Sequence, residues 1–203
     1  MENITFIGEH LLIGNLGKLL VVLALVTALL SVLFYVRSGE GKTKERTLAR
    51  SMFFIHAASV VGVFITLFFI IQKHYFEYAY AYEHSSMALP LRYMVSCFWE
   101  GQEGSFLLWM FWHAVLGCIL IFKSKSWQAP VLTVIALAQV ILGSMLLGFE
   151  IGDFKIGSSP FQLMREHNPE SLLLPVLDRL GKANYLEIYK EGNGLNPLLQ
   201  NYW

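Results

Sequence analysis

The sequence predicts an all-α integral membrane protein with about four transmembrane helices and an external, loop-rich C-terminal segment. Of its 203 residues, 55% are hydrophobic and only 15% are charged, whereas a soluble domain is about 25% charged. Four stretches are apolar over about 20 residues, the length that an α-helix needs to cross about 30 Å of hydrocarbon. Fifteen basic and fifteen acidic residues balance, so the composition indicates no nucleic-acid partner.

The four expected spans follow one another within the first 150 residues. Pro130 falls in the first turn of the last one, where a proline is tolerated. Residues 1–150 are therefore expected to form a transmembrane region and residues 151–203 an external segment. The spans are expected at about 13–36, 51–71, 105–122 and 129–149.

The basic residues of the loops predict the orientation. Arg37, Lys42, Lys44, Arg46 and Arg50 lie between the first two spans, and Lys123 and Lys125 lie between the last two. Loops rich in lysine and arginine face the cytoplasm. The N-terminus, the aromatic loop 72–104 and the segment after residue 150 are therefore expected on the external side.

The cysteine pattern excludes several classes of protein. Cys97 and Cys118 are the only two cysteines, and the second lies in an apolar stretch, where a thiol behaves as a small hydrophobic group. The chain has no Cys-x-x-Cys-His and no Cys-x-x-Cys. The sequence therefore predicts neither a disulfide framework, nor covalently attached haem, nor a thioredoxin-like site.

The stretch 98–112, FWEGQEGSFLLWMFW, has two interpretations. In the first, its tryptophans belong to an interfacial aromatic belt and its polar residues cap a helix N-terminus. In the second, Gly101 and Gly104 let a flat ligand approach the backbone, and the tryptophans stack on an aromatic macrocycle. The residues concerned are Trp99, Glu100, Gln102, Glu103, Ser105, Trp109 and Trp112.

His56 and His113 fall inside the second and third spans. An ionisable group within a membrane span is by default a functional candidate, here a metal ligand or a proton relay. The alternative is that each imidazole only forms a hydrogen bond with a neighbouring helix. No spacing links the two histidines.

Three segments resemble one known family. WEGQEGSFLLW (99–109), GLNPLLQNYW (194–203) and, less specifically, SSPF (158–161) are similar to signature segments of the CcmF/CcsA family of cytochrome c-type biogenesis proteins. All three occur in the family's order, so the resemblance covers nearly the whole chain.

The resemblance implies a haem-handling protein of the bacterial inner membrane, with its N-terminus and C-terminal segment in the periplasm. In that family haem is delivered and ligated covalently to apocytochrome c with the help of other maturation proteins. The resemblance places a haem cleft at Trp99, Glu100, Gly101, Gln102, Glu103, Gly104, Ser105, Trp109, Asn196, Pro197 and Gln200.

The resemblance also implies features that this chain lacks. In the family, a His-Pro-Pro motif with an axial haem ligand and a tryptophan-rich external domain follow the NPLLQ segment. Both would begin after Trp203, so the chain is expected to be an N-terminal portion that leads to a further transmembrane helix. It is then either part of a haem lyase or a non-catalytic membrane scaffold of the assembly complex. A proton- or quinone-linked membrane protein that uses His56 and His113 is the third alternative.

Overall fold

A computed structural model describes residues 8–38, 42–151, 154–167, 186 and 189–200, with the backbone alone for 149–151 and 154–156. The chain divides into two compact units. The loop unit comprises Met1–Leu16, Thr66–Gly104 and Pro160–Trp203, and the bundle unit comprises Gly17–Ile65 and Ser105–Ser159. The C-terminal residues from Pro160 onward therefore group with two earlier segments of the chain.

The four expected membrane spans are confirmed, and the protein is an all-α membrane protein. Within the part of the chain that the structure describes, four helices are long and apolar enough to cross a bilayer. In their most apolar stretches only 28–44% of the residues are buried within the protein, so most of these side chains are left for lipid. The helices are α1 (Leu11–Arg37), α2 (Thr43–Gln72), α6 (Gln102–Lys123) and α7 (Gln128–Met145), which a short 3₁₀ turn, η1 (Lys125–Trp127), precedes.

Two helix boundaries differ from the expected spans by four residues or more. Helix α2 begins at Thr43, eight residues before the expected start, because the polar stretch TKERTLAR is itself helical, with Glu45 in the first turn near the positive end of the helix dipole. Helix α7 ends at Met145, four residues before the expected end. Gly148 then has a φ of +60°, a conformation that favours glycine and ends helices.

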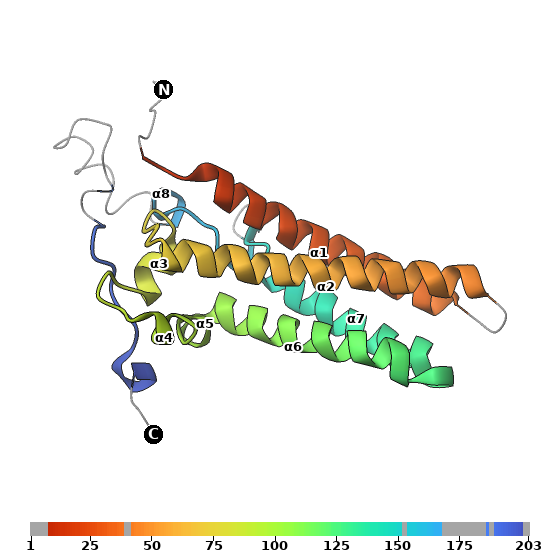
Figure 1. The fold of residues 1–203 in the computed structure, drawn as a ribbon. Helices are drawn as coiled ribbons and strands as arrows, with labels where there is room; N and C mark the ends of the chain where they lie inside the picture. The colour runs from red at the N-terminus through yellow and green to blue at the C-terminus, as the bar shows by residue number, and fades with distance from the viewer. Residues whose placement is uncertain (1–7, 39–41, 152–153, 168–185, 187–188, 201–203) are drawn as a thin grey trace. The chain divides into compact units, whose positions relative to one another are not determined.

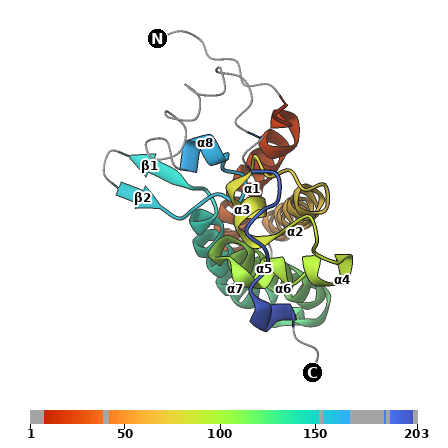
Figure 2. The ribbon, with the colours of Figure 1, turned by 90° about the vertical axis from the view of Figure 1, so that its left-hand side faces the viewer.

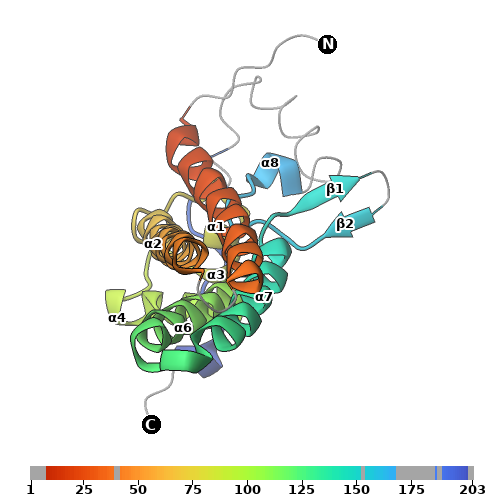
Figure 3. The ribbon, with the colours of Figure 1, turned by 90° about the vertical axis from the view of Figure 1, so that its right-hand side faces the viewer.

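The bundle unit contains the parts of α1, α2, α6 and α7 that lie side by side in Figures 1 and 3. Small residues let these helices approach closely, as in other membrane bundles. A methyl group added at Gly117 of α6 would overlap the ring of Phe53 on α2, and one added at Gly62 would lie 3.0 Å from Leu20 of α1. One part of the bundle has a core of buried side chains that pack together: Tyr35, Ala49, Phe53, Ile121, Leu132 and Ala136.

A short antiparallel hairpin follows α7. Strand β1 (Phe149–Ile151) pairs with β2 (Phe154–Ile156), with Phe149 opposite Ile156. The loop-rich segment expected from residue 151 onward did not include this hairpin. The sequence does contain a hairpin signal, because two apolar-polar-apolar triplets, FEI and FKI, flank Gly152 and Asp153, a dipeptide typical of two-residue hairpin connections.

The loop unit contains short elements (Figure 2), and backbone hydrogen bonds join its distant segments. Ala79 donates to the carbonyl of Gln162 at 2.9 Å, and Gly194 donates to that of Ser85 at 3.0 Å. These bonds satisfy backbone groups that would otherwise be left unpaired. The elements are α3 (Ala79–His84), α4 (Leu91–Met94), α5 (Cys97–Glu100), α8 (Met164–His167) and η3 (Pro197–Gln200).

Candidate functional site

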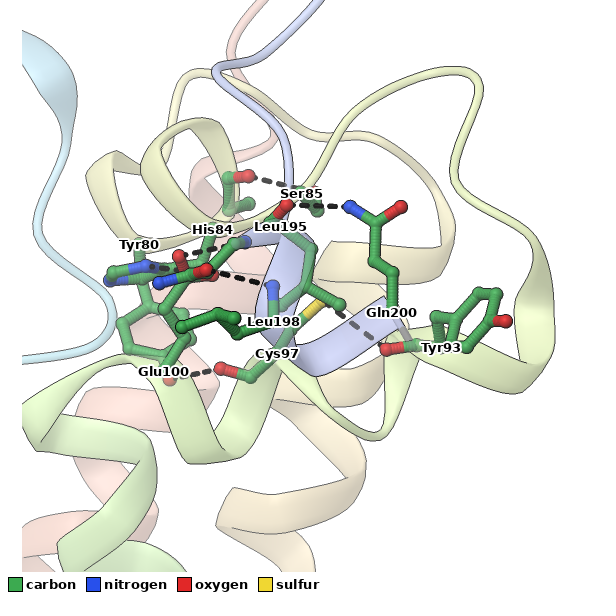
Figure 4. A network of polar contacts seen from close by, with 11 residues as sticks. Tyr80, His84, Ser85, Tyr93, Cys97, Glu100, Leu195, Leu198 and Gln200 are labelled. Atoms are coloured by element: carbon green, nitrogen blue, oxygen red, sulfur yellow. Dashed lines mark hydrogen bonds and ion pairs between the residues drawn. The ribbon is translucent and has the colours of Figure 1, made fainter. Parts of the chain in front are cut away.

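The two most specific sequence motifs meet in the loop unit at Glu100 (Figure 4). One oxygen of its carboxylate accepts a hydrogen bond from the backbone N–H of Asn196 at 3.0 Å. The other lies 3.5 Å from Nδ1 of His84, so these two groups attract each other whenever the imidazole is protonated. Glu100 therefore links the WEGQEG stretch to the NPLLQ stretch, as a single haem cleft would require. We call Tyr80, His84, Glu100 and Asn196 the motif junction.

Tyr80 is a buried member of the motif junction and fixes the positions of its neighbours. Its side chain is buried, and its hydroxyl donates to the carbonyl of Cys97 at 2.8 Å. Burial and, next, the negative charge of Glu103 raise the pKa of Tyr80, so the phenol stays protonated and remains a donor. The ring centroid of His84 lies 4.6 Å from that of Tyr80. This packing orients the imidazole that faces Glu100.

The two glycines of WEGQEG are required by this packing. A methyl group at Gly101 would lie 2.7 Å from Nε2 of His84, and one at Gly104 would lie 2.5 Å from the carbonyl oxygen of Phe98. Tyr80 approaches both positions as well. The space beside both glycines is thus occupied by the protein itself, which gives them a role in packing rather than an open backbone for a ligand.

Two polar side chains of the NPLLQ segment form hydrogen bonds with the segment's own backbone. The side-chain oxygen of Asn196 accepts from the N–H of Leu198 at 3.0 Å, and Nε2 of Gln200 donates to the carbonyl of Leu195 at 2.6 Å. Pro197 opens η3, where its fixed φ suits a first helical position. Residues 201–203 of the expected motif lie outside the described residues.

The other residues predicted for the cleft differ in their exposure to solvent, and they belong to two different units. In the loop unit Trp99 is 64% exposed and Gln102 is exposed, while Glu103 is half-buried. Ser105 and Trp109 belong to the bundle unit, where Trp109 is 56% exposed. Large exposed aromatic rings suit either of the two interpretations made from the sequence, a membrane interface or a stacking surface.

His56 and His113 each have a bond that supports a structural role. Nδ1 of the fully buried His56 lies 2.8 Å from the carbonyl oxygen of Ala24, which links α2 to α1. Nδ1 of His113 lies 2.8 Å from the carbonyl oxygen of Trp109 in its own helix. Within the described ranges, no three His, Cys, Asp or Glu side chains are grouped so as to hold a metal ion.

A second polar cluster, at the start of α1, was not predicted from the sequence. The Tyr78 hydroxyl donates to the carbonyl of His10 at 2.8 Å and accepts from the N–H of Gly14 at 3.0 Å. Glu77 accepts from both the backbone N–H and the ring of His10, and Arg165 donates to Glu9 at 2.9 Å. The sequence offered one signal, the aromatic-rich loop that contains Glu77 and Tyr78, but nothing that paired it with residues near the N-terminus.

These features define a class: a multi-pass α-helical membrane protein with a loop unit assembled from three separate segments of the chain. Comparisons with known proteins agree, although no family model matches. The chain is 31% identical over 195 residues to a cytochrome c-type biogenesis protein CcmF of Pseudomonas aeruginosa, 30% over 190 residues to that of Escherichia coli, and 28% over 193 residues to that of Haemophilus influenzae. The chain thus matches a portion of CcmF.

The match involves almost all of this chain and a minor part of its relatives. The three alignments include 92–94% of the chain but only 25–26% of each relative. A solved structure of the cytochrome c heme lyase CcmF shares the fold with a TM-score of 0.62 at 24% identity, over 83% of this chain and 28% of that one. The chain therefore spans about a quarter of the length of the proteins that it matches.

Proposed function

We propose that this chain is a haem-handling membrane protein of cytochrome c assembly. The hydrogen bond between Glu100 and Asn196 carries the proposal, because it brings together the two motifs that resemble the CcmF/CcsA family. The similarity to proteins named for cytochrome c biogenesis supports it over nearly the whole chain. Haem is the substrate under this proposal, and apocytochrome c and other maturation proteins are the partners.

The chain's contribution would be a rigid, partly aromatic surface that shields haem from water. Trp99 offers a flat ring with 64% of its surface exposed, and its neighbour Glu100 is tied to both His84 and Asn196. Gln102 and Glu103 present polar groups beside it. The remaining members of the proposed cleft in the loop unit are Gly101, Gly104, Pro197 and Gln200, some of which act through packing alone.

The reaction served by such a surface is the addition of a cysteine thiol to a haem vinyl group. The sulfur forms a bond to one vinyl carbon, the thiol hydrogen ends on the other, and the double bond becomes single. All atoms and electrons of the two reactants are retained in the product, so the step needs correct placement and exclusion of water rather than a further reactant. An ordered surface with exposed aromatic rings can provide both.

We also propose that the chain lies in a bacterial inner membrane with its N-terminus and residues 151–203 in the periplasm. The basic loops 37–50 and 123–125 support this orientation. The grouping of Met1–Leu16, Thr66–Gly104 and Pro160–Trp203 in one unit is consistent with one side for all three. Single cysteines at Met87 and Ser126, labelled with an impermeant maleimide in intact spheroplasts, test it: we expect reaction at position 87 only.

Haem absorbance tests the function itself. The protein is purified from its native membrane together with its partners, and haem is measured from the Soret band and as a pyridine complex. For Trp99→Ala we expect about three- to tenfold less bound haem, which corresponds to the loss of about 1 kcal/mol of stacking. Trp127→Ala is the matched control, since Trp127 is 72% exposed and lies in the basic loop expected on the other side.

The same variants separate a haem-handling protein from a scaffold. Covalent haem in the membrane's c-type cytochromes is stained after electrophoresis. A haem-handling role predicts a weaker stain for Trp99→Ala at unchanged protein level. Unchanged haem content and unchanged staining would favour the non-catalytic scaffold and contradict the proposal.

A further inference from the structure

A cavity of about 310 Å³ lies in the loop unit, apart from the residues of the motif junction. Its walls come from three segments: the stretch before α1, the turn after α2, and the residues around Tyr189. Nitrogen-bearing side chains are unusually frequent among them. The polar lining residues are His10, Lys73, His74, Glu77 and Lys190, and Tyr75 is among the aromatic ones.

The imidazole of His10 is held in one orientation. Its Nδ1 lies 2.9 Å from Oε1 of Glu77, and the same oxygen accepts the backbone N–H of His10 at 3.0 Å. The ring stacks on Tyr75 with centroids 3.9 Å apart and planes 10° from parallel. Because the carboxylate is an acceptor, Nδ1 carries the hydrogen, and Nε2 is the nitrogen available to a ligand. About half of the His10 side chain is exposed, whereas Glu77 is almost completely buried.

His74 occupies a position where a glycine is usual. It follows the end of α2 with a φ of +54°, while its N–H bonds to the carbonyl of Ile71 and that of Tyr75 bonds to the carbonyl of Ile70. This is the Schellman pattern, whose left-handed residue is most often glycine. Nδ1 of His74 is buried and has no hydrogen-bond partner among the described residues. Burial also lowers the pKa of His74. An unfavourable backbone conformation and an unpaired polar atom at one residue point to a role beyond folding.

The charges of the lining favour an anion. Among the described residues, Lys73 and Lys190 form no ion pair, and the single carboxylate, Glu77, is already engaged by His10. The N-terminus of the 27-residue helix α1 begins directly after His10, and this end of a helix favours negative charge. In the first turn the N–H of Gly14 already donates to Tyr78, so at this position the helix contributes through its field rather than through a free N–H.

We propose that this cavity binds the acidic group, carboxylate or phosphate, of an amphiphilic ligand. Lys73 and Lys190 supply the positive charge, and the oriented Nε2 of His10 and the unpaired Nδ1 of His74 supply directional contacts. Two sources have this chemistry, the propionate of a porphyrin and the phosphate of a lipid. The anion site itself stands on the cavity, and the porphyrin as one of its two sources rests on the function proposed above.

Two pairs of probes test it and distinguish the sources. Protoporphyrin IX is compared with its dimethyl ester, and dihexanoyl phosphatidic acid with dihexanoylglycerol, each titrated into the protein in neutral detergent at pH 7.5. We expect the acid of one pair to bind about tenfold more tightly than its neutral counterpart, as charge-assisted contacts to two cations predict. A preference in the porphyrin pair identifies a carboxylate ligand, and one in the lipid pair identifies a phosphate.

The double variant Lys73→Gln/Lys190→Gln should reduce that preference to below about threefold. Lys123→Gln/Lys125→Gln removes the same charge from exposed lysines elsewhere and should leave it unchanged. Ring-¹⁵N histidine spectra of the unmodified protein give a readout that needs no substitution: the His10 and His74 signals should shift with the preferred probe and that of His113 should not. Equal binding of the acid and its neutral counterpart in both pairs, a preference that survives in the double variant, or unmoved His10 and His74 signals would overturn the proposal.

Discussion

The carboxylate of Glu100 accepts a hydrogen bond from the backbone N–H of Asn196, 96 residues further along the chain, at 3.0 Å. This bond joins α5 to the segment that opens η3. A hydrogen bond to a charged acceptor contributes about 1.5–3 kcal/mol when well shielded and less when partly exposed. The side chain of Glu100 is 19% exposed, so we expect this hydrogen bond to contribute a free energy near the lower limit of that range.

Removing this acceptor should loosen the NPLLQ segment. In Glu100→Ala we expect the Asn196 amide to exchange with solvent about tenfold faster, corresponding to about 1.4 kcal/mol, as measured by hydrogen exchange and mass spectrometry. Glu100→Gln retains a carbonyl oxygen and should show a smaller change. The exposed Glu191 supplies the control, Glu191→Ala. Equal exchange in all four proteins would show that the bond does not hold the segment.

Gly104→Ala should destabilise the loop unit because the added methyl group meets the carbonyl of Phe98 and the hydroxyl of Tyr80. Overpacking of this kind costs about 1–3 kcal/mol. Gly143→Ala is the matched control: its methyl group would lie 3.5 Å from Leu25 and from Met110, and alanine favours the helix by up to about 1 kcal/mol. Thermal unfolding in detergent should therefore rank Gly143→Ala at or above the unmodified protein and Gly104→Ala below it. The reverse order would contradict the packing described here.

Tyr78→Phe should release the first turn of α1. The lost hydroxyl leaves the His10 carbonyl without its donor and the Gly14 N–H without its acceptor, at a cost of about 1–3 kcal/mol. Faster amide exchange at residues 11–14 is the measurement. Tyr75→Phe serves as the control because it keeps the ring that stacks on His10. If both variants behave alike, the hydroxyl of Tyr78 has no special role.

The stability of the protein should also fall at alkaline pH through Tyr78. Burial raises the pKa of this tyrosine to about 12 from its usual value near 10. A raised acid pKa means that the unfolded chain loses the proton first, so the stabilisation is complete below about pH 10 and is lost between about pH 10 and 12. Unfolding temperatures measured from pH 8 to 11.5 should decline less steeply in Tyr78→Phe than in the unmodified protein. Parallel curves would count against this assignment.

Cys97 should resist alkylation in the folded protein. Burial, and then the neighbouring Glu100, raise the pKa of its thiol to about 12, so at pH 8 only about one molecule in ten thousand carries the reactive thiolate. N-ethylmaleimide should modify Cys97 only after unfolding, as seen by peptide mass spectrometry. A cysteine introduced at Met87, which is 58% exposed in the same unit, should react within minutes. Rapid modification of Cys97 in the folded state would exclude the buried environment described here.

His56 should prove dispensable for haem. Its ring bonds to the carbonyl of Ala24 within the bundle, and a glutamine retains a donor for that oxygen. For His56→Gln we expect unchanged Soret absorbance and a change in unfolding free energy within about 1.5 kcal/mol. A lost Soret band at unchanged stability would instead identify His56 as an iron ligand.

The membrane spans followed from the sequence because hydropathy is a local property. A run of about 20 apolar residues has few alternatives to a transmembrane helix, and all four runs form one. The start of α2 did not follow, since Thr43–Arg50 is helical without being apolar. The hairpin β1–β2 did not follow either, because each strand has only three residues, too few for a clear alternation of apolar and polar side chains.

Only part of the candidate site could be predicted, because contacts between residues far apart in the chain leave little trace in a single sequence. Motif resemblance singled out Glu100 and Asn196, and the two lie in contact. Tyr80 and His84 were not selected, although they explain why Gly101 and Gly104 are glycines. His10, Glu77 and Tyr78 were missed as well, because partners 64–68 residues apart leave no periodic pattern in a single sequence.

The hydroxyl of Tyr78 forms hydrogen bonds with the start of α1, a helix that is synthesised well before Tyr78. Gly14 emerges from the ribosome 64 residues ahead of Tyr78, and all of α2 lies between them. The N-terminal end of the first span therefore cannot reach its final hydrogen bonding until the second span has been translated. The hydrogen bonding of this helix end is consequently a late step of assembly, because it requires a residue that is synthesised after the next helix.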